Sequence, residues 1–356
     1  MPSFMPRKIG EKTLSLAFLL LLGAQGLRAG DFSFVVRGEV QRPGVWQLSE
    51  LKKFPVIPVR LREFSPEGKY RGLCAYRVVP FALLLERVGI EKSPQNAFRH
   101  KIDMAIFLAN RSGQKLVLSW GEIFYQSNPT HYLLAIAKKV IKPTAHPAVA
   151  PGSCTTCHTR KRVYRGRLLP RVLPDALTGV KFLVVRSGQI VGELRNLASV
   201  EIRSVRRKIP ATTTRNHVFS PEVLVVSPEK TEKLAEILET GNIKITTFRL
   251  PEIGSGCGYH GTFTFQGYPV KALFARELSN PDFWGLFVSA PDGYRTFVSR
   301  NEMVGALGKP AILAFLKDGH PLESPEGKFM LVLPNDLFFD RWIRAVNRIE
   351  ILVYSR

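Results

Sequence analysis

Residues 259–273 read Tyr-His-Gly-Thr-Phe-Thr-Phe-Gln-Gly-Tyr-Pro-Val-Lys-Ala-Leu. Apolar and polar side chains alternate over 262–266, which predicts a strand because successive side chains of a strand point to opposite faces. The apolar spacing changes to that of a helix over 270–277, directly after Pro269, and proline suits the first turn of a helix. This stretch therefore predicts a strand followed at once by a helix.

The same pattern occurs earlier in the chain, at residues 70–84, and predicts a strand over 73–77 and a helix over 81–88. Four residue types recur at a constant offset without gaps, as the pairs Tyr70 and Tyr259, Gly72 and Gly261, Pro80 and Pro269, Leu84 and Leu273. Four further pairs of blocks follow in the same order. The first pair runs from Phe107 to Glu122 and from Phe287 to Glu302, and the second is 132–138 with 311–317. The third pair begins at Val172 and Val332, and the fourth at Val200 and Ile349. Five blocks in one order indicate an internal duplication.

The duplicated pattern predicts two mixed α+β domains of short strands and few helices. Ser112-Gly113 and Asp292-Gly293 each stand between two apolar runs, as hairpin turns do. Ser227 to Glu229 are expected to open a helix that continues through Leu238, with Gly241 just past its end.

We divide the chain into a signal peptide at 1–29, a first domain at 30–206, a linker at 207–217 and a second domain at 218–356. The linker lies in the basic stretch from Arg203 to Asn216, which predicts an exposed connector. The first copy carries extra chain at 139–171, where the second copy has the shorter connection 318–331. The connection between the first two blocks is also nine residues longer in the first copy.

The extra chain in the first copy contains the motif Cys154-Thr-Thr-Cys157-His158. A C-x-x-C-H motif is typical of covalent attachment of haem c, in which two thiolates bind the vinyl groups and the adjacent imidazole ligates the iron. A disulfide or half of a zinc site are the alternatives, but zinc would want a second Cys or His pair at suitable spacing. We expect one haem c, with His146 as the first candidate for the distal iron ligand and His131 as the next. A methionine ligand or an open sixth position are further alternatives.

The N-terminus predicts export. Arg7, Lys8 and Lys12 precede the apolar run 14–22, and small residues follow near Ala29. The run is shorter than the ~20 residues that span a bilayer, so we expect no transmembrane span in the mature chain and a periplasmic or otherwise exported location.

The chain of 356 residues has a formal net charge of +22. Export removes it from nucleic acid, so acidic protein surfaces or an anionic membrane face are better partners, and an acidic redox partner protein is the one we expect. No Asp or Glu occurs between the nine cations of a basic belt that flanks the haem motif, namely Lys138, Lys139, Lys142, Arg160, Lys161, Arg162, Arg165, Arg167 and Arg171. This belt could pair with haem propionates or orient such a partner.

Several blocks of the chain resemble the sulfite-oxidase-type molybdopterin-binding domain, over most of 218–356 and more weakly over 31–206. The resemblance lies in Gly267-Tyr-Pro-Val-Lys-Ala-Leu273, Ser289-Ala-Pro-Asp-Gly-Tyr294, the segment 314–322 and Leu331-Val-Leu-Pro-Asn335. It implies two tandem copies of that fold, a mixed β-sheet with short helices.

The resemblance also implies a candidate molybdenum ligand, Cys257, which stands in roughly the loop that carries the family's ligating cysteine. Gly258-Tyr-His follows it where the family has Gly-Asn-Arg, and the first copy has no cysteine between Glu63 and Tyr70. A buried thiol or a disulfide with Cys74 are the alternatives, although Cys74 aligns with Phe263 on a strand and is expected in the core. The signal lacks a twin-arginine motif, whereas the family's proteins are normally exported folded with their cofactor.

The sequence thus favours an exported monohaem c-type electron-transfer protein built on two degenerate molybdopterin-binding-like domains. Two alternatives remain open. One is a molybdopterin-dependent oxidoreductase that passes electrons from a molybdenum site to haem c, and the other is a haem-based redox or gas sensor. The motif predicts no catalytic residue for either alternative.

Overall fold

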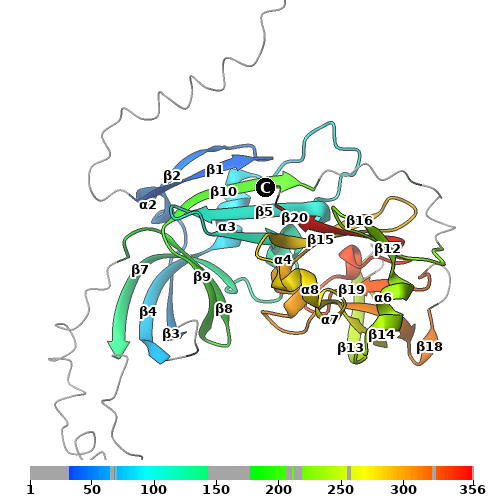
Figure 1. Cartoon of the computed structure of the whole chain (residues 1–356). Coiled ribbons are helices and arrows are strands. Elements are labelled where there is room, and N and C mark those ends of the chain that lie inside the picture. Colours follow the sequence, from blue (N-terminus) through cyan, green and yellow to red (C-terminus); the bar gives the residue numbers. More distant parts are fainter. Residues whose placement is uncertain are drawn as a thin grey trace, which may run out of the picture.

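The computed structural model describes residues 32–64, 68, 70–142, 177–205, 211, 219–254, 258–322 and 326–354. These residues form mixed β-sheets with a few short helices, so the predicted α+β class is confirmed. Figure 1 shows the first copy on the left and the second copy, which ends in red, on the right. No helix among the described residues combines the length and apolar character needed to cross a membrane.

Each copy contains a five-stranded sheet, and the strand order is the same in both. The order in the first copy is β2 (Gly44–Gln47), β1 (Ser33–Gly38), β10 (Leu197–Ser204), β5 (Met104–Asn110) and β6 (Lys115–Ser119). The order in the second copy is β12 (Thr231–Lys233), β11 (Leu224–Val226), β20 (Arg348–Val353), β15 (Phe283–Ser289) and β16 (Arg295–Ser299). In each copy the first strand is parallel to the last strand: β1 is parallel to β10, and β11 is parallel to β20.

The register of these sheets also repeats. Phe107 lies opposite Glu201 on β10, and Phe287 lies opposite Glu350 on β20. These are the residues that the sequence comparison aligned, so the duplication is confirmed at the level of individual strand pairs.

A second layer of strands differs between the copies. In the first copy it is a closed barrel of β3 (Ile57–Phe64), β4 (Tyr70–Pro80), β7 (Tyr132–Lys142), β8 (Lys181–Arg186) and β9 (Gln189–Leu194). In the second copy it is an open sheet of β13 (Thr246–Gly254), β14 (Gly258–Pro269), β17 (Ile312–Lys317) and β18 (His320–Pro321), with β19 (Met330–Val332) paired to β17. The barrel closes where Arg62 of β3 pairs with Gln189 of β9.

The helices are short and follow strands. They are α2 (Leu48–Leu51), α3 (Phe81–Val88), α4 (Trp120–Phe124), α6 (Leu234–Thr240), α7 (Val270–Leu273), α8 (Ala275–Ser279) and α9 (Arg300–Val304), with single 3-10 turns η1 (Lys101–Asp103) and η4 (Phe339–Arg341). The predicted helix over 81–88 is confirmed. It starts directly after Pro80 and ends at Gly89, whose φ of 68° is readily adopted by glycine.

The helix predicted from Ser227 is wrong in its first half. Ser227 instead caps a turn, in which its hydroxyl accepts the Lys230 N–H at 3.0 Å, and this turn joins the antiparallel strands β11 and β12. Serine favours turns as much as helix starts, and strand pairing decides between them here. The predicted helix over 270–277 is likewise divided at Phe274 into α7 and α8.

Two boundaries also differ from the prediction. Arg203 belongs to β10 and Val205 is buried, so the connector between the copies begins after them. Apart from Ala211, the predicted linker 207–217 lies outside the described residues. In the second copy, Ile312 pairs with Val332. In the first copy, the residue equivalent to Ile312 is Leu133, and it pairs with Leu183, so Leu183 is the counterpart of Val332. The alignment of Val332 with Val172 is therefore wrong, because a short Val-Leu-Pro match does not report strand pairing.

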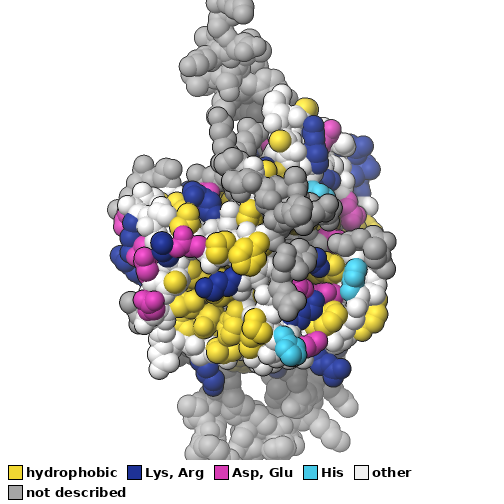
Figure 2. All heavy atoms as spheres, turned by 90° about the vertical axis from the view of Figure 1, so that its right-hand side faces the viewer, with side chains coloured by type: hydrophobic (Ala, Val, Ile, Leu, Met, Phe, Trp, Pro, Cys, Tyr) yellow, Lys and Arg dark blue, Asp and Glu magenta, His cyan; other side chains and the backbone are white. Residues whose placement is uncertain are grey.

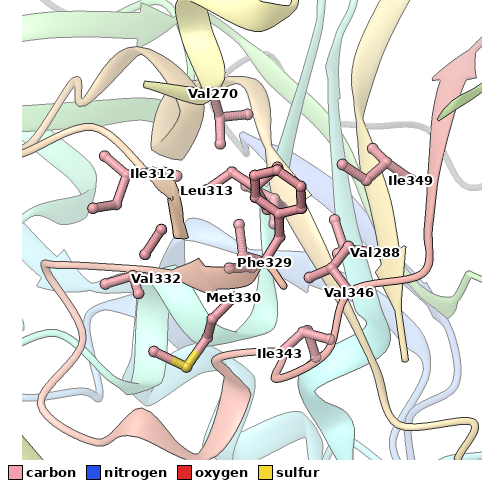
Figure 3. Close-up of a cluster of buried hydrophobic side chains, with 14 of the residues drawn as sticks. Val270, Val288, Ile312, Leu313, Phe329, Met330, Val332, Ile343, Val346 and Ile349 are labelled. Carbon is pink, nitrogen blue, oxygen red and sulfur yellow. The ribbon is translucent and has the colours of Figure 1, made fainter. Parts of the chain in front are cut away.

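Each copy has a hydrophobic core of its own. The core of the second copy consists of residues between 223 and 351, and the main core of the first copy consists of residues between 34 and 202. Figure 3 shows Phe329 at the centre of the second core, with Val270, Leu313 and Val346 directed toward it. The two copies then pack sheet against sheet through a smaller apolar cluster formed by Ala105, Val117, Val205, Phe287, Phe297 and Leu352.

A buried polar network crosses the interface between the copies. Ser119 with Glu122, and Ser299 with Glu302, form equivalent capping boxes at the starts of α4 and α9. The Ser299 hydroxyl donates to Glu122 across the interface at 2.9 Å. Arg341, which has no exposed surface, donates to the Ser119 hydroxyl at 3.1 Å and also to Glu302.

The network contains three buried carboxylates and one guanidinium. Arg341 forms a two-pronged ion pair with Asp336 at 2.5 and 2.7 Å, and Glu122 accepts the Tyr132 hydroxyl at 2.9 Å. Burial raises the pKa of Asp336 to about 7, although Arg341 opposes the change. Burial, and then the charge of Glu302, raise the pKa of Glu122 well above its usual value. The network therefore retains protons that ordinary carboxylates would have released.

These shifts predict that acidification stabilises the protein in this region. The folded pKa of Asp336, about 7, exceeds its ordinary value of 3.8, so its contribution is fully present below about pH 4 and is lost as the pH rises through 7. We expect Asp336 to lower the free energy of unfolding by about 2–4 kcal/mol between pH 4 and pH 8. Urea unfolding of the wild type and of Asp336→Asn across this range measures it, and the variant should show the flatter profile. Parallel profiles would contradict the assignment.

Candidate functional site

The residues of the predicted haem site lie outside the described residues. This applies to Cys154, Cys157 and His158, to the candidate distal ligand His146, and equally to Cys257. The structure describes the chain up to Lys142 and again from Leu177. The predicted role of these side chains therefore stays a prediction.

The undescribed segment connects two neighbouring strands of the barrel. It follows β7 and precedes β8, which pair in antiparallel fashion from Tyr132 with Val184 to Ala135 with Lys181. Residues 139–142 still belong to β7 and pair with β4, so the insertion begins later than the predicted residue 139. The equivalent connection of the second copy, from Lys317 of β17 to Met330 of β19, is much shorter. The haem motif is thus confined to a connection that is long in one copy only.

A cluster of buried charges lies in the strands that bracket this connection. Lys138 of β7 pairs with Glu63 of β3 at 3.0 Å, and both side chains are nearly fully buried. Lys181, at the start of β8, pairs with Glu193 of β9 at 2.5 Å and lies 3.9 Å from Glu63. Tyr76 of β4 donates its hydroxyl to Glu63. The cluster thereby links the strand before the insertion to the strand after it.

The electrostatics of the cluster follow from burial. Burial, and then the hydrogen bond to Glu63, raise the pKa of Tyr76 far above its ordinary value, so the hydroxyl stays protonated. Burial also acts to raise the pKa of Glu193, but hydrogen bonds from Lys181 and Arg195 outweigh it and lower this pKa overall. The carboxylate of Glu193 is therefore held in its charged form.

The buried pair changes the interpretation of the basic belt. The sequence counts Lys138 among the nine cations of the belt, but in the structure Lys138 lies opposite Tyr76 in the barrel and is neutralised by Glu63. Lys139, its neighbour, is exposed. Only the latter could meet a partner.

The second copy contains the same ion pair at equivalent positions. Lys317 pairs with Glu252 at 3.1 Å and lies over the ring of Phe265, which takes the place of Tyr76. A further carboxylate, Glu326, accepts from Lys317 at 2.8 Å. Sequence reasoning missed these residues, although Glu63 and Glu252 stand at the same offset as Tyr70 and Tyr259. A search of the aligned copies for paired charges would have found them.

Neutralising Glu63 should lower the stability of the protein measurably. Glu63→Gln leaves Lys138 and Lys181 buried with one carboxylate fewer, so we expect the free energy of unfolding to fall by about 2–3 kcal/mol. Glu201→Gln is the matched control, because Glu201 pairs with Arg37 at the surface and should cost below about 1 kcal/mol. Urea unfolding measures both. Equal losses would show that the buried cluster contributes no more than a surface pair.

Two further residues named from the sequence are described. His131 lies just before β7, at the end of the strand remote from Lys142, and its ring contacts Gln126 at 2.6 Å, while burial lowers its pKa. Cys74 is 2 % exposed and packs in the barrel core with Leu61 and Val78, as predicted. Among the described residues, no group of three His, Cys, Asp or Glu side chains could hold a metal ion.

One face of the second copy shows no patch of a single charge (Figure 2). Figure 2 shows this face, with basic and acidic side chains mixed around a group of hydrophobic side chains. The exposed large hydrophobic residues of the second copy are Phe219, Ile245, Tyr259, Val304, Leu337 and Phe338. The charge excess of the chain is therefore not concentrated on this face.

Comparison with known proteins gives little further information. No protein family matches the sequence, and no curated protein matches it. Among solved structures, the sulfane dehydrogenase SoxCD from Paracoccus pantotrophus is similar with a TM-score of 0.29 and 10% identity, over 94% of this chain and 80% of that chain. Similarity at this level assigns neither the fold nor the function of this chain.

Proposed function

We propose that this chain is an exported monohaem c-type electron-transfer protein. The observation that carries the proposal is the motif Cys154-Thr-Thr-Cys157-His158 in a connection that only the first copy has enlarged. Function is commonly located in such insertions on a stable scaffold. The two copies are then the support, and the insertion supplies the chemistry.

The donor set of the motif suits haem c. Cys154 and Cys157 would form thioether bonds to one porphyrin edge, and His158 would ligate the iron from one side, with His146 as the candidate on the other. When bound, haem supplies a one-electron redox centre. A second histidine ligand would give a lower reduction potential than a methionine ligand. The residues of the chain hold the group and set this potential.

The scaffold in this proposal is a pair of degenerate sulfite-oxidase-type molybdopterin-binding domains, as the sequence resemblance implies. Export by the predicted signal at 1–29 would place the chain in the periplasm or an equivalent compartment, where cytochrome c thiols meet the attachment machinery. An acidic redox protein is the proposed partner. Its contact residues would be the cations near the motif, Lys139, Lys142 and Arg160 to Arg171, without Lys138.

The decisive experiment is a cofactor analysis of the purified chain. Haem staining after denaturing electrophoresis should reveal haem that remains with the polypeptide, and the reduced pyridine complex should have the spectrum of haem with two thioethers. Molybdenum and pterin analysis of the same sample distinguishes the oxidoreductase alternative, and an open sixth position in the ferrous spectrum would favour the sensor. A colourless protein with a disulfide or zinc at Cys154 and Cys157 would exclude all three.

A further inference from the structure

An open cavity of about 430 Å³ lies in the seam between the two copies. The first copy contributes the β5–β6 hairpin with Lys115, and the second contributes the start of β15, the start of α9 and Tyr354. A neighbouring cavity of about 420 Å³ shares Lys115, Leu116 and Asn301 with it. The volume is in the range of small-molecule sites, which occur preferentially between domains.

The lining combines aromatic rings with cations. Trp284 and Tyr354 provide the rings, and the Lys115 ammonium lies 4.3 Å from the centre of the Tyr354 ring. Arg300 donates to the backbone carbonyls of Leu278 and Asn280, which leaves guanidinium N–H groups for another acceptor.

The polar groups of the cavity favour an anion. Lys115 has no carboxylate partner in the part of the chain that the structure describes. The Asn301 side-chain amide nitrogen is buried and has no hydrogen-bond acceptor there either. One carboxylate, Asp282, also lines the cavity, so the two cations exceed it by one charge. Surplus positive charge carried by N–H donors suits a bound carboxylate.

The duplication provides an internal reference for this site. Arg295 of the second copy is the counterpart of Lys115 in the first, since both stand at the start of the equivalent strands β16 and β6. Around Arg295 the site is filled by the chain itself. The guanidinium pairs with Asp103 at 3.3 Å and lies 4.8 Å from the ring of Phe98.

The filling comes from the longer connection of the first copy. Asn96 and Phe98 lie between α3 and β5, and Asn96 accepts from Arg295 at 3.3 Å. The equivalent connection of the second copy, between α8 and β15, is only a few residues long and leaves the site around Lys115 open. The cation has a ring beside it in both related sites, Phe98 at Arg295 and Tyr354 at Lys115, but only Arg295 has an ion pair with a carboxylate among the described residues.

We propose that the seam cavity binds a small carboxylate that carries a flat aromatic group. The carboxylate lies between Lys115 and Arg300, and the ring packs on Trp284 and Tyr354. This is the arrangement that Asp103 and Phe98 provide around Arg295. The proposal is independent of the haem, because none of these residues belongs to the insertion.

Calorimetric titration of the purified full chain, with whatever haem it carries, tests the proposal with phenylacetate as the probe. Phenylacetate should bind saturably, and Lys115→Gln should weaken it about tenfold, as expected for one charge-assisted hydrogen bond. Phenylacetamide, which lacks the charge, and acetate, which lacks the ring, should each bind about tenfold more weakly or worse. Lys53→Gln, at an exposed lysine elsewhere on the first copy, should leave the affinity unchanged.

Three results would overturn the proposal. The first is no saturable heat up to about 10 mM phenylacetate, which is weaker than any useful site. The second is equal affinity for phenylacetate and phenylacetamide. The third is an equal loss in Lys53→Gln and Lys115→Gln, which would indicate general attraction of an anion by a basic chain. Thermal unfolding of both variants should match the wild type, because both lysines are exposed.

Discussion

Replacing Cys154 and Cys157 together with alanine should abolish covalent haem completely. The thioether bonds require both sulfurs, and no other cysteine pair in the chain has this spacing next to a histidine. Haem staining after denaturing electrophoresis and the intact mass of the polypeptide measure the loss. The folded scaffold should persist, because the described part of each copy already contains an extensive core, of residues between 34 and 202 in the first copy and between 223 and 351 in the second.

Cys74→Ala is the matched control for this prediction. Cys74 is buried in the barrel, so the variant should lose some stability but keep its full content of covalent haem. His158→Ala adds a second comparison, because it should leave the sulfurs in place and change the optical and redox properties of the iron. Covalent haem that survives in the double cysteine variant would contradict the attachment site.

Replacing Arg341 with methionine should lower the free energy of unfolding by about 3–5 kcal/mol. The guanidinium is fully buried and donates to Asp336, Glu302 and the Ser119 hydroxyl, so its removal leaves carboxylates with no positive partner at the interface. Methionine fills much of the volume, which separates the loss of charge from the loss of packing. Urea unfolding at pH 8 measures the change.

The loss in Arg341→Met should become smaller as the pH falls from 8 to 5. Protonation removes the charge of Asp336, whose folded pKa of about 7 would rise further without the arginine. Arg111→Met, on the exposed β5–β6 hairpin, should stay within about 0.5 kcal/mol of the wild type. A loss in Arg341→Met that does not vary with pH would show that packing, and not charge, is the cause.

The parts of the fold that the sequence predicted are those set by local chemistry. Pro80 fixes where a helix can begin, and Gly113 and Gly293 adopt φ angles of 83° and 81° that their hairpin turns require. Comparing the two copies extended these local signals to whole domains, because an offset that holds for Phe107 and Phe287 also holds for the strands that carry them.

The buried polar contacts could not be predicted in this way. Arg341 meets Ser119 across 222 positions of the sequence, and neither residue has a local feature that distinguishes it from a surface residue. Lys138 was misjudged for the same reason, since its partner Glu63 lies on another strand. For the haem site the sequence predicts the three attachment residues from their spacing, but the distal ligand depends on folding of the insertion and has no comparable signal.

The adjacency of the first and last strands in each copy bears on how this architecture arose. Because β1 lies beside β10 and β11 beside β20, the first and last strands of every copy are neighbours in its own sheet, with the entrance and the exit of the chain at opposite ends of this parallel pair. A gene segment encoding such a unit can be doubled without threading the chain across an existing sheet. Once doubled, one unit can keep the shape while a loop of the other is free to lengthen.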